Sequence, residues 1–124
     1  MKFVSALFVI ALVTTSCSSR SISDPTQAKD CTELVEAGKI VAERVLERLE
    51  GQTLEELEAA NPEEPLAPID YLMRVEEFDN QATALGCGKD QLRLQACSMY
   101  VDLEIKASGD LAQDFLAPYL EACN

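Results

Sequence analysis

The stretch from residue 30 to residue 51, DCTELVEAGKIVAERVLERLEG, carries a regular helical pattern. Asp30 is placed to cap the start of a helix, Glu33 completes a capping box with it, and Gly51 favours the end. Gly38 lies inside the apolar stripe, so we expect another helix to approach closely at this position. The stripe recurs with the 3.6-residue period of an amphipathic helix, and its members are Cys31, Leu34, Val35, Gly38, Val41, Ala42, Val45 and Leu49.

Capping residues and helix breakers divide the chain after Gly51 into further helices. Thr53 and Glu56 form a second capping box, which opens a short helix ending at Ala60. Three prolines then indicate a stiff loop over residues 61–68. Apolar periodicity resumes after this loop and predicts three longer helices. They are expected over residues 69–85, 91–107 and 110–123.

The predicted helix over residues 91–107 has apolar residues on more than one face. A helix that is apolar over so wide an arc is expected at the centre of its bundle. A ligand pocket lined by this helix is a second interpretation of the same pattern. The first face holds Leu92, Ala96, Met99 and Leu103, and the second holds Leu94, Cys97, Val101 and Ile105.

No run of alternating apolar and polar residues indicates a strand. The sequence therefore predicts an all-α fold, a small disulfide-braced helical bundle with four main helices and one short helix. A chain of 124 residues is long enough for one domain, which we place at residues 30–124. Residues 17–29 are mostly polar and are expected to form a flexible tether.

Four cysteines of the predicted domain are expected to form two disulfide bridges. In an up-and-down bundle, Cys31, Cys87 and Cys123 fall near one end, while Cys97 lies about two helical turns away. This separation disfavours a bridge between Cys87 and Cys97. Two pairings remain open: Cys31–Cys87 with Cys97–Cys123, which we favour, and Cys31–Cys97 with Cys87–Cys123. A zinc site is not expected, because the sequence has no C-x-x-C pair.

Residues 1–16 have the features of a signal peptide. Lys2 is followed by an uncharged and almost wholly apolar run over residues 3–13, and then by small residues. At 1.5 Å per residue this run spans roughly 16 Å of helix, which is short for a bilayer core of ~30 Å. We therefore expect export with cleavage rather than a membrane span.

The residues that end this segment, Val13-Thr14-Thr15-Ser16-Cys17, resemble the lipobox of bacterial lipoprotein precursors. The resemblance implies that Cys17 carries diacylglycerol and becomes the first residue after cleavage. Lipidation of Cys17 would also leave an even number of cysteines for bridges. Thr14 departs from the branched aliphatic residue that is usual there. Since Thr14 and Ser16 also fit the small-x-small rule of ordinary signal peptidase, plain secretion stays open.

Three short motifs in the domain are similar to motifs of small exported bacterial proteins of actinobacterial type. The resemblance covers about ninety residues and implies no particular activity. The motifs are Thr53-Leu54-Glu55-Glu56-Leu57, Thr83-Ala84-Leu85-Gly86-Cys87 and Leu120-Glu121-Ala122-Cys123.

Composition argues against several classes of function. The absence of histidine removes Ser-His-Asp and Cys-His catalysis and imidazole ligation of metals. A formal net charge of −12, without a basic patch, argues against nucleic-acid binding. No carboxylate pair stands out among the 22 acidic residues. We therefore expect no enzymatic activity, no catalytic residues, no metal and no cofactor.

The expected protein is an exported, acidic, helical domain of the cell envelope. It is expected to face outward from the cell membrane on an acyl anchor at Cys17, or to be secreted. Its expected role is non-catalytic binding of another envelope protein. The alternative role is that of a carrier for a small hydrophobic ligand or lipid.

Overall fold

The computed structural model describes residues 22–124, and over this range the chain is helical without a strand. The predicted signal peptide, residues 1–16, and the predicted lipidation site, Cys17, lie outside the described residues. The all-α prediction is confirmed for the described range. The elements in chain order are η1 (Pro25–Gln27), α1 (Cys31–Leu49), α2 (Leu54–Ala60), α3 (Ala67–Met73), α4 (Val75–Leu85), α5 (Lys89–Met99), α6 (Leu103–Lys106) and α7 (Asp110–Glu121).

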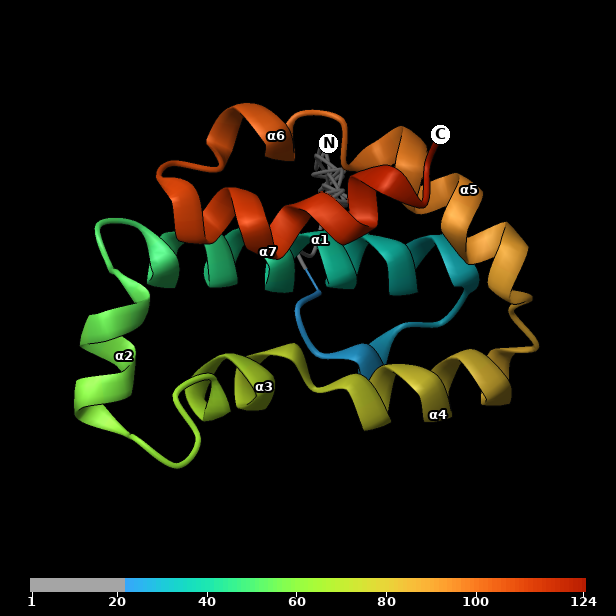
Figure 1. Cartoon of the computed structure of the whole chain (residues 1–124). Coiled ribbons are helices and arrows are strands. Elements are labelled where there is room, and N and C mark those ends of the chain that lie inside the picture. The colour runs from blue at the N-terminus through green and yellow to red at the C-terminus, as the bar shows by residue number, and fades with distance from the viewer. Residues whose placement is uncertain (1–21) are drawn as a thin grey trace, which may run out of the picture.

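Helix α1 is the centre of the fold. Helices α3 to α7 all pack against it, and Figure 1 shows α5, α6 and α7 on one side and α3 and α4 on the other. The start of α1 is capped as predicted, since the Asp30 carboxylate accepts a hydrogen bond from the Glu33 N–H at 2.8 Å. Glu33 reaches back in turn, but to the N–H of Lys29. The buried residues of α1 are Leu34, Val35, Ala37, Val41, Val45, Leu46 and Leu49.

The single helix predicted over residues 69–85 is wrong, because the chain breaks at Arg74 into α3 and α4. Arg74 has left-handed backbone angles, φ 48° and ψ 42°, which cost a residue with a Cβ atom roughly 1–2 kcal/mol. Its guanidinium forms ion pairs with Glu77 and with Asp24, the latter at 3.3 Å. The apolar period runs through this break, so periodicity alone did not reveal it.

The single helix predicted over residues 91–107 is also wrong. Helix α5 begins at Lys89 and ends at Met99, and the chain re-enters a helix only at Leu103. Tyr100 in the intervening turn directs its side chain toward α1, where its hydroxyl bonds to the Val35 carbonyl. The break therefore allows a bulky aromatic side chain to pack across α1.

The interpretation of this segment as the bundle centre is corrected as well. Leu103 is fully buried in the core, but Leu94, Val101 and Ile105 are 64%, 67% and 89% exposed. Since α1 occupies the centre, one face of the α5–α6 segment meets the core and the other meets solvent. We call Leu94, Val101 and Ile105 the outer face.

Ion pairs to α1 explain why α6 turns Ile105 outward. Lys39 of α1 pairs with Asp102 at 2.8 Å, and Glu43 of α1 pairs with Lys106 at 3.0 Å. The hydrogen bond from Lys39 is the main reason why the pKa of the Asp102 carboxyl is lowered. These contacts hold the polar side of α6 against the flank of α1, so that Ile105 points away from it.

Two disulfide bridges brace the bundle. Cys31 at the start of α1 is joined to Cys87 in the α4–α5 turn, with Cα atoms 5.8 Å apart. Cys97 in α5 is joined to Cys123 after α7, with Cα atoms 5.6 Å apart. This is the pairing favoured from the sequence. Such bridges indicate an oxidising compartment outside the cytosol.

The segment before α1 is packed rather than free. Ala28 is buried, and its carbonyl accepts a hydrogen bond from the Gln81 side chain of α4 at 2.8 Å. The hydroxyl and the N–H of Thr26 both donate to Asp24, which lowers the pKa of that carboxyl. The flexible tether predicted over residues 17–29 therefore does not extend through η1.

Candidate functional site

An apolar groove with a volume of about 270 Å³ lies over the middle of α1. Its floor is a run of small and medium side chains on α1, and its walls come from the α3–α4 segment and from α7. The floor consists of Gly38, Val41, Ala42 and Val45. The walls are Met73, Val75, Phe78 and Asp79 on one side and Phe115, Leu116 and Tyr119 on the other, and Tyr100 also lines the groove.

Tyr100 is fixed over the groove floor by a hydrogen bond and by the absence of a side chain at Gly38. The hydroxyl of Tyr100 donates to the Val35 carbonyl at 2.6 Å. A Cβ atom at position 38 would collide with that hydroxyl, so glycine is required for the contact. Burial, with a smaller effect of Tyr119, raises the pKa of Tyr100. The close approach predicted at Gly38 is therefore present, and an aromatic side chain makes it.

The charged side chains that line the groove are of one sign, negative. Asp79 is the one ionisable carboxylate among its described lining residues, and no lysine or arginine is among them. Asp79 forms no ion pair with any residue between positions 22 and 124. Tyr119 is about half-exposed at the opposite wall, and its ring centroid lies 5.7 Å from that of Phe115. The groove thus combines aromatic surface with a single negative charge.

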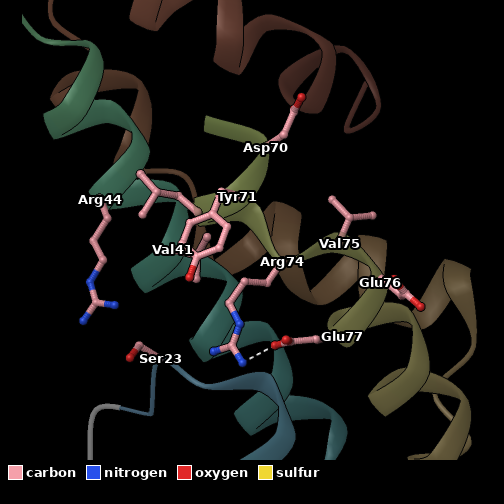
Figure 2. Close-up of a pocket in the computed structure, with 10 residues that line it drawn as sticks. Ser23, Val41, Arg44, Asp70, Tyr71, Arg74, Val75, Glu76 and Glu77 are labelled. Atoms are coloured by element: carbon pink, nitrogen blue, oxygen red, sulfur yellow. Dashed lines mark ion pairs between the residues drawn. The ribbon is translucent and has the colours of Figure 1, made fainter. Parts of the chain in front are cut away.

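A second, more polar hollow of about 750 Å³ lies beside the groove and shares Val41 and Val75 with it. Figure 2 shows Arg44 of α1 and Arg74 extending toward the segment that carries Ser23. Arg74 is committed to its ion pairs with Asp24 and Glu77, and further carboxylates line the hollow. Because both charge signs are present, this hollow does not define a ligand class.

The outer face borders a third hollow, of about 760 Å³, between α5 and α7. Val101 lines this hollow together with Tyr119 and Leu120 of α7. The rim contains Arg93, whose guanidinium donates to the Ala122 carbonyl at 3.0 Å, and Glu104. Apolar surface therefore continues from the outer face toward the end of α7.

The site residues predicted from the sequence fall into two groups. Cys31, Cys87, Cys97 and Cys123 form the two bridges, whereas Cys17 lies outside the described residues. Within residues 22–124, no cluster of three or more acidic, cysteine or histidine side chains is arranged to hold a metal ion. None of the helices in this range combines the length and apolar character needed to cross a membrane.

Comparison with known proteins identifies no relative of this chain. No family model, no curated protein and no solved structure matches the chain. The groove and the outer face are therefore interpreted from their own chemistry.

Sequence reasoning identified the floor of the groove but not its role. Gly38, Val41, Ala42 and Val45 were predicted as one apolar face, intended for another helix. The α3–α4 wall and Tyr100 come from segments whose turns at Arg74 and Tyr100 were not predicted, whereas the α7 wall lies in the helix predicted over residues 110–123. The small size of the floor residues was the available signal, since small side chains in an apolar stripe leave space above a helix.

Proposed function

We propose that the protein is an exported, non-catalytic binding protein of the cell envelope, anchored through lipid on Cys17, which binds another protein through the outer face. The exposure of three large apolar side chains in one segment carries this proposal. Val101 also lines the hollow between α5 and α7, and exposed apolar surface of this kind is typical of interaction sites. The absence of histidine from the sequence supports a non-catalytic role.

Export and anchoring are supported by the two bridges and by the lipobox-like stretch that ends at Cys17. The mass of the intact protein, recovered from the envelope, the medium and the cytoplasm, tests both. We expect a chain beginning at Cys17 that carries acyl groups and has four hydrogens fewer than its reduced form. An unmodified chain that begins at Cys17 would instead indicate plain secretion. An uncleaved, fully reduced chain would contradict export.

Site-specific photocrosslinking in cells tests the protein-binding role. A photoreactive amino acid at Val101 is expected to capture one partner of defined mass, because this residue is 67% exposed on the outer face. The captured product is expected to disappear when Ile105 is changed to Asp. Leu54 is a matched control position, since it is apolar and exposed but lies on α2.

Two outcomes of the crosslinking experiment count against the protein-binding role. Identical products from Val101 and Leu54, or no product from Val101, would contradict a binding role for the outer face. Ile105 is 89% exposed, so the Asp substitution is not expected to unfold the domain. Its circular dichroism spectrum and melting temperature provide the folding control.

A carrier role for a small hydrophobic ligand is the second candidate, and the apolar groove favours it. Four aromatic rings, those of Phe78, Tyr100, Phe115 and Tyr119, line a space of about 270 Å³. Ligand pockets are mostly apolar with a few fixed polar groups, and pockets for drug-sized ligands measure roughly 300–1,000 Å³. The groove is therefore suited to a ligand somewhat smaller than a drug molecule.

A further inference from the structure

The side chains that line the apolar groove favour a ligand of one particular charge. This inference about the ligand rests on the second proposed function, that of a small-ligand carrier. Its floor is uncharged, since Gly38, Val41, Ala42 and Val45 all come from the apolar stripe of α1. A ligand on this floor must present an apolar surface to avoid leaving polar groups without hydrogen bonds.

The polar side-chain groups that line the groove are the Asp79 carboxylate and the hydroxyls of Tyr100 and Tyr119. Asp79 is exposed at the α4 wall and has no cationic partner within the described residues. The Tyr100 hydroxyl is already bonded to the Val35 carbonyl, so Tyr100 presents its ring to the groove. The described groove therefore offers a ligand a carboxylate and aromatic rings, without a basic side chain.

Both features select for positive charge. A carboxylate attracts an ammonium group directly, and the faces of aromatic rings attract cations through their quadrupole. An anionic ligand of the same shape would be repelled by Asp79 and by the net charge of −12 on the chain. The volume of about 270 Å³ limits the apolar part to about one aromatic ring or a short alkyl chain.

We propose that the groove binds a small apolar molecule with one positive charge, such as an arylalkylamine or a short alkylammonium ion. The apolar part lies on the α1 floor between Phe78 and Phe115. The ammonium group lies at the mouth of the groove, against Asp79 and the ring of Tyr119.

Titration with three probes that share a phenylethyl group and differ in their polar group tests the proposal. Purified protein with both bridges formed is titrated with 2-phenylethylamine, 2-phenylethanol and 3-phenylpropanoate, and binding is followed by calorimetry and by shifts of assigned NMR signals. The ammonium probe is expected to bind about tenfold more tightly than the alcohol, and the carboxylate probe most weakly. Shifts are expected at Met73, Phe78 and Tyr119.

Substitutions at Asp79 separate the charge effect from the apolar effect. Asp79→Asn is expected to reduce the ammonium preference to about two- to threefold, because the aromatic rings remain, while leaving the alcohol affinity unchanged. Asp79→Lys is expected to reverse the preference in favour of 3-phenylpropanoate. Glu76→Gln is the matched control, because Glu76 is an exposed carboxylate on the same helix that does not line the groove. It is expected to keep the tenfold preference.

Each other outcome overturns a defined part of the argument. Equal binding of the three probes, or a tenfold ammonium preference that survives Asp79→Asn undiminished, overturns the charge selectivity and leaves the carrier function standing. Failure of all three probes to bind overturns both the selectivity and the carrier function. Asp79 is exposed, so its variants are expected to fold, and their NMR spectra check this.

Discussion

Replacement of both Cys31 and Cys87 by serine is expected to lower the free energy of unfolding by about 4 kcal/mol. The bridge closes a loop of 56 residues, and the entropy that it removes from the unfolded chain grows with loop length. A domain of this size has a total stability of about 5–15 kcal/mol. Urea unfolding of the double variant, followed by circular dichroism, measures the loss.

The second bridge provides the matched comparison. Cys97–Cys123 closes a loop of 26 residues, for which the same model gives about 3.5 kcal/mol. The Cys97→Ser, Cys123→Ser variant is therefore expected to be slightly more stable than the Cys31→Ser, Cys87→Ser variant. A larger loss for the shorter loop would show that loop entropy does not govern the stabilisation. Losses below about 1 kcal/mol for both would show that the bridges are not structural supports.

Gly38→Ala is expected to destabilise the protein by about 2 kcal/mol, although alanine is normally the better helix residue. The added methyl group collides with the Tyr100 hydroxyl, and the collision displaces that hydroxyl from the Val35 carbonyl. Overpacking costs about 1–3 kcal/mol and a lost hydrogen bond about 1 kcal/mol. The higher helix propensity of alanine offsets about 0.5–1 kcal/mol of this loss of stability. Denaturant unfolding of the single variant measures the balance.

A double-mutant cycle with Tyr100→Phe identifies the cause. The Phe variant alone is expected to lose about 1 kcal/mol, because it removes the hydroxyl and its bond to Val35. In that background Gly38→Ala is expected to be neutral or slightly stabilising, since the colliding atom is gone. An equal cost of Gly38→Ala in both backgrounds would mean that the Tyr100 hydroxyl is not what the glycine accommodates.

The sequence predicted the central features of the fold because they depend on local signals. The stripe from Cys31 to Leu49 and the cap at Asp30 are visible in one short window. Up-and-down helix order and helix rise disfavoured a Cys87–Cys97 bridge and left two pairings, of which the favoured one, Cys31–Cys87 with Cys97–Cys123, is present. These inferences needed only the directions of the helices, which the breaks within the later segments do not reverse.

The breaks themselves were not predictable from periodicity. Arg74 has left-handed backbone angles, which are typical of glycine, and its ion pairs with Asp24 and Glu77 come from tertiary structure. Tyr100 leaves the helix where its hydroxyl reaches Val35 across the fold. Long-range contacts of this kind override helix propensity, and a local pattern does not contain them.

The candidate sites were predictable only in part, for the same reason. The doubled apolar pattern of residues 91–107 was recognised, but its second face was assigned to the interior instead of to solvent. The floor of the groove was recognised as apolar, but its aromatic walls depend on how α4 and α7 sit beside α1. Asp79 had no distinguishing signal in the sequence, because it is one of 22 acidic residues.

The central position of α1 in the fold also has a consequence for folding during synthesis. This helix is synthesised before the five helices α3 to α7 that pack against it, and its contacts with α5 and α7 join residues far apart in the sequence. A chain that ends before α5 leaves the side of α1 that α5, α6 and α7 cover exposed to water, so this part of the core forms only when the C-terminal helices have been synthesised.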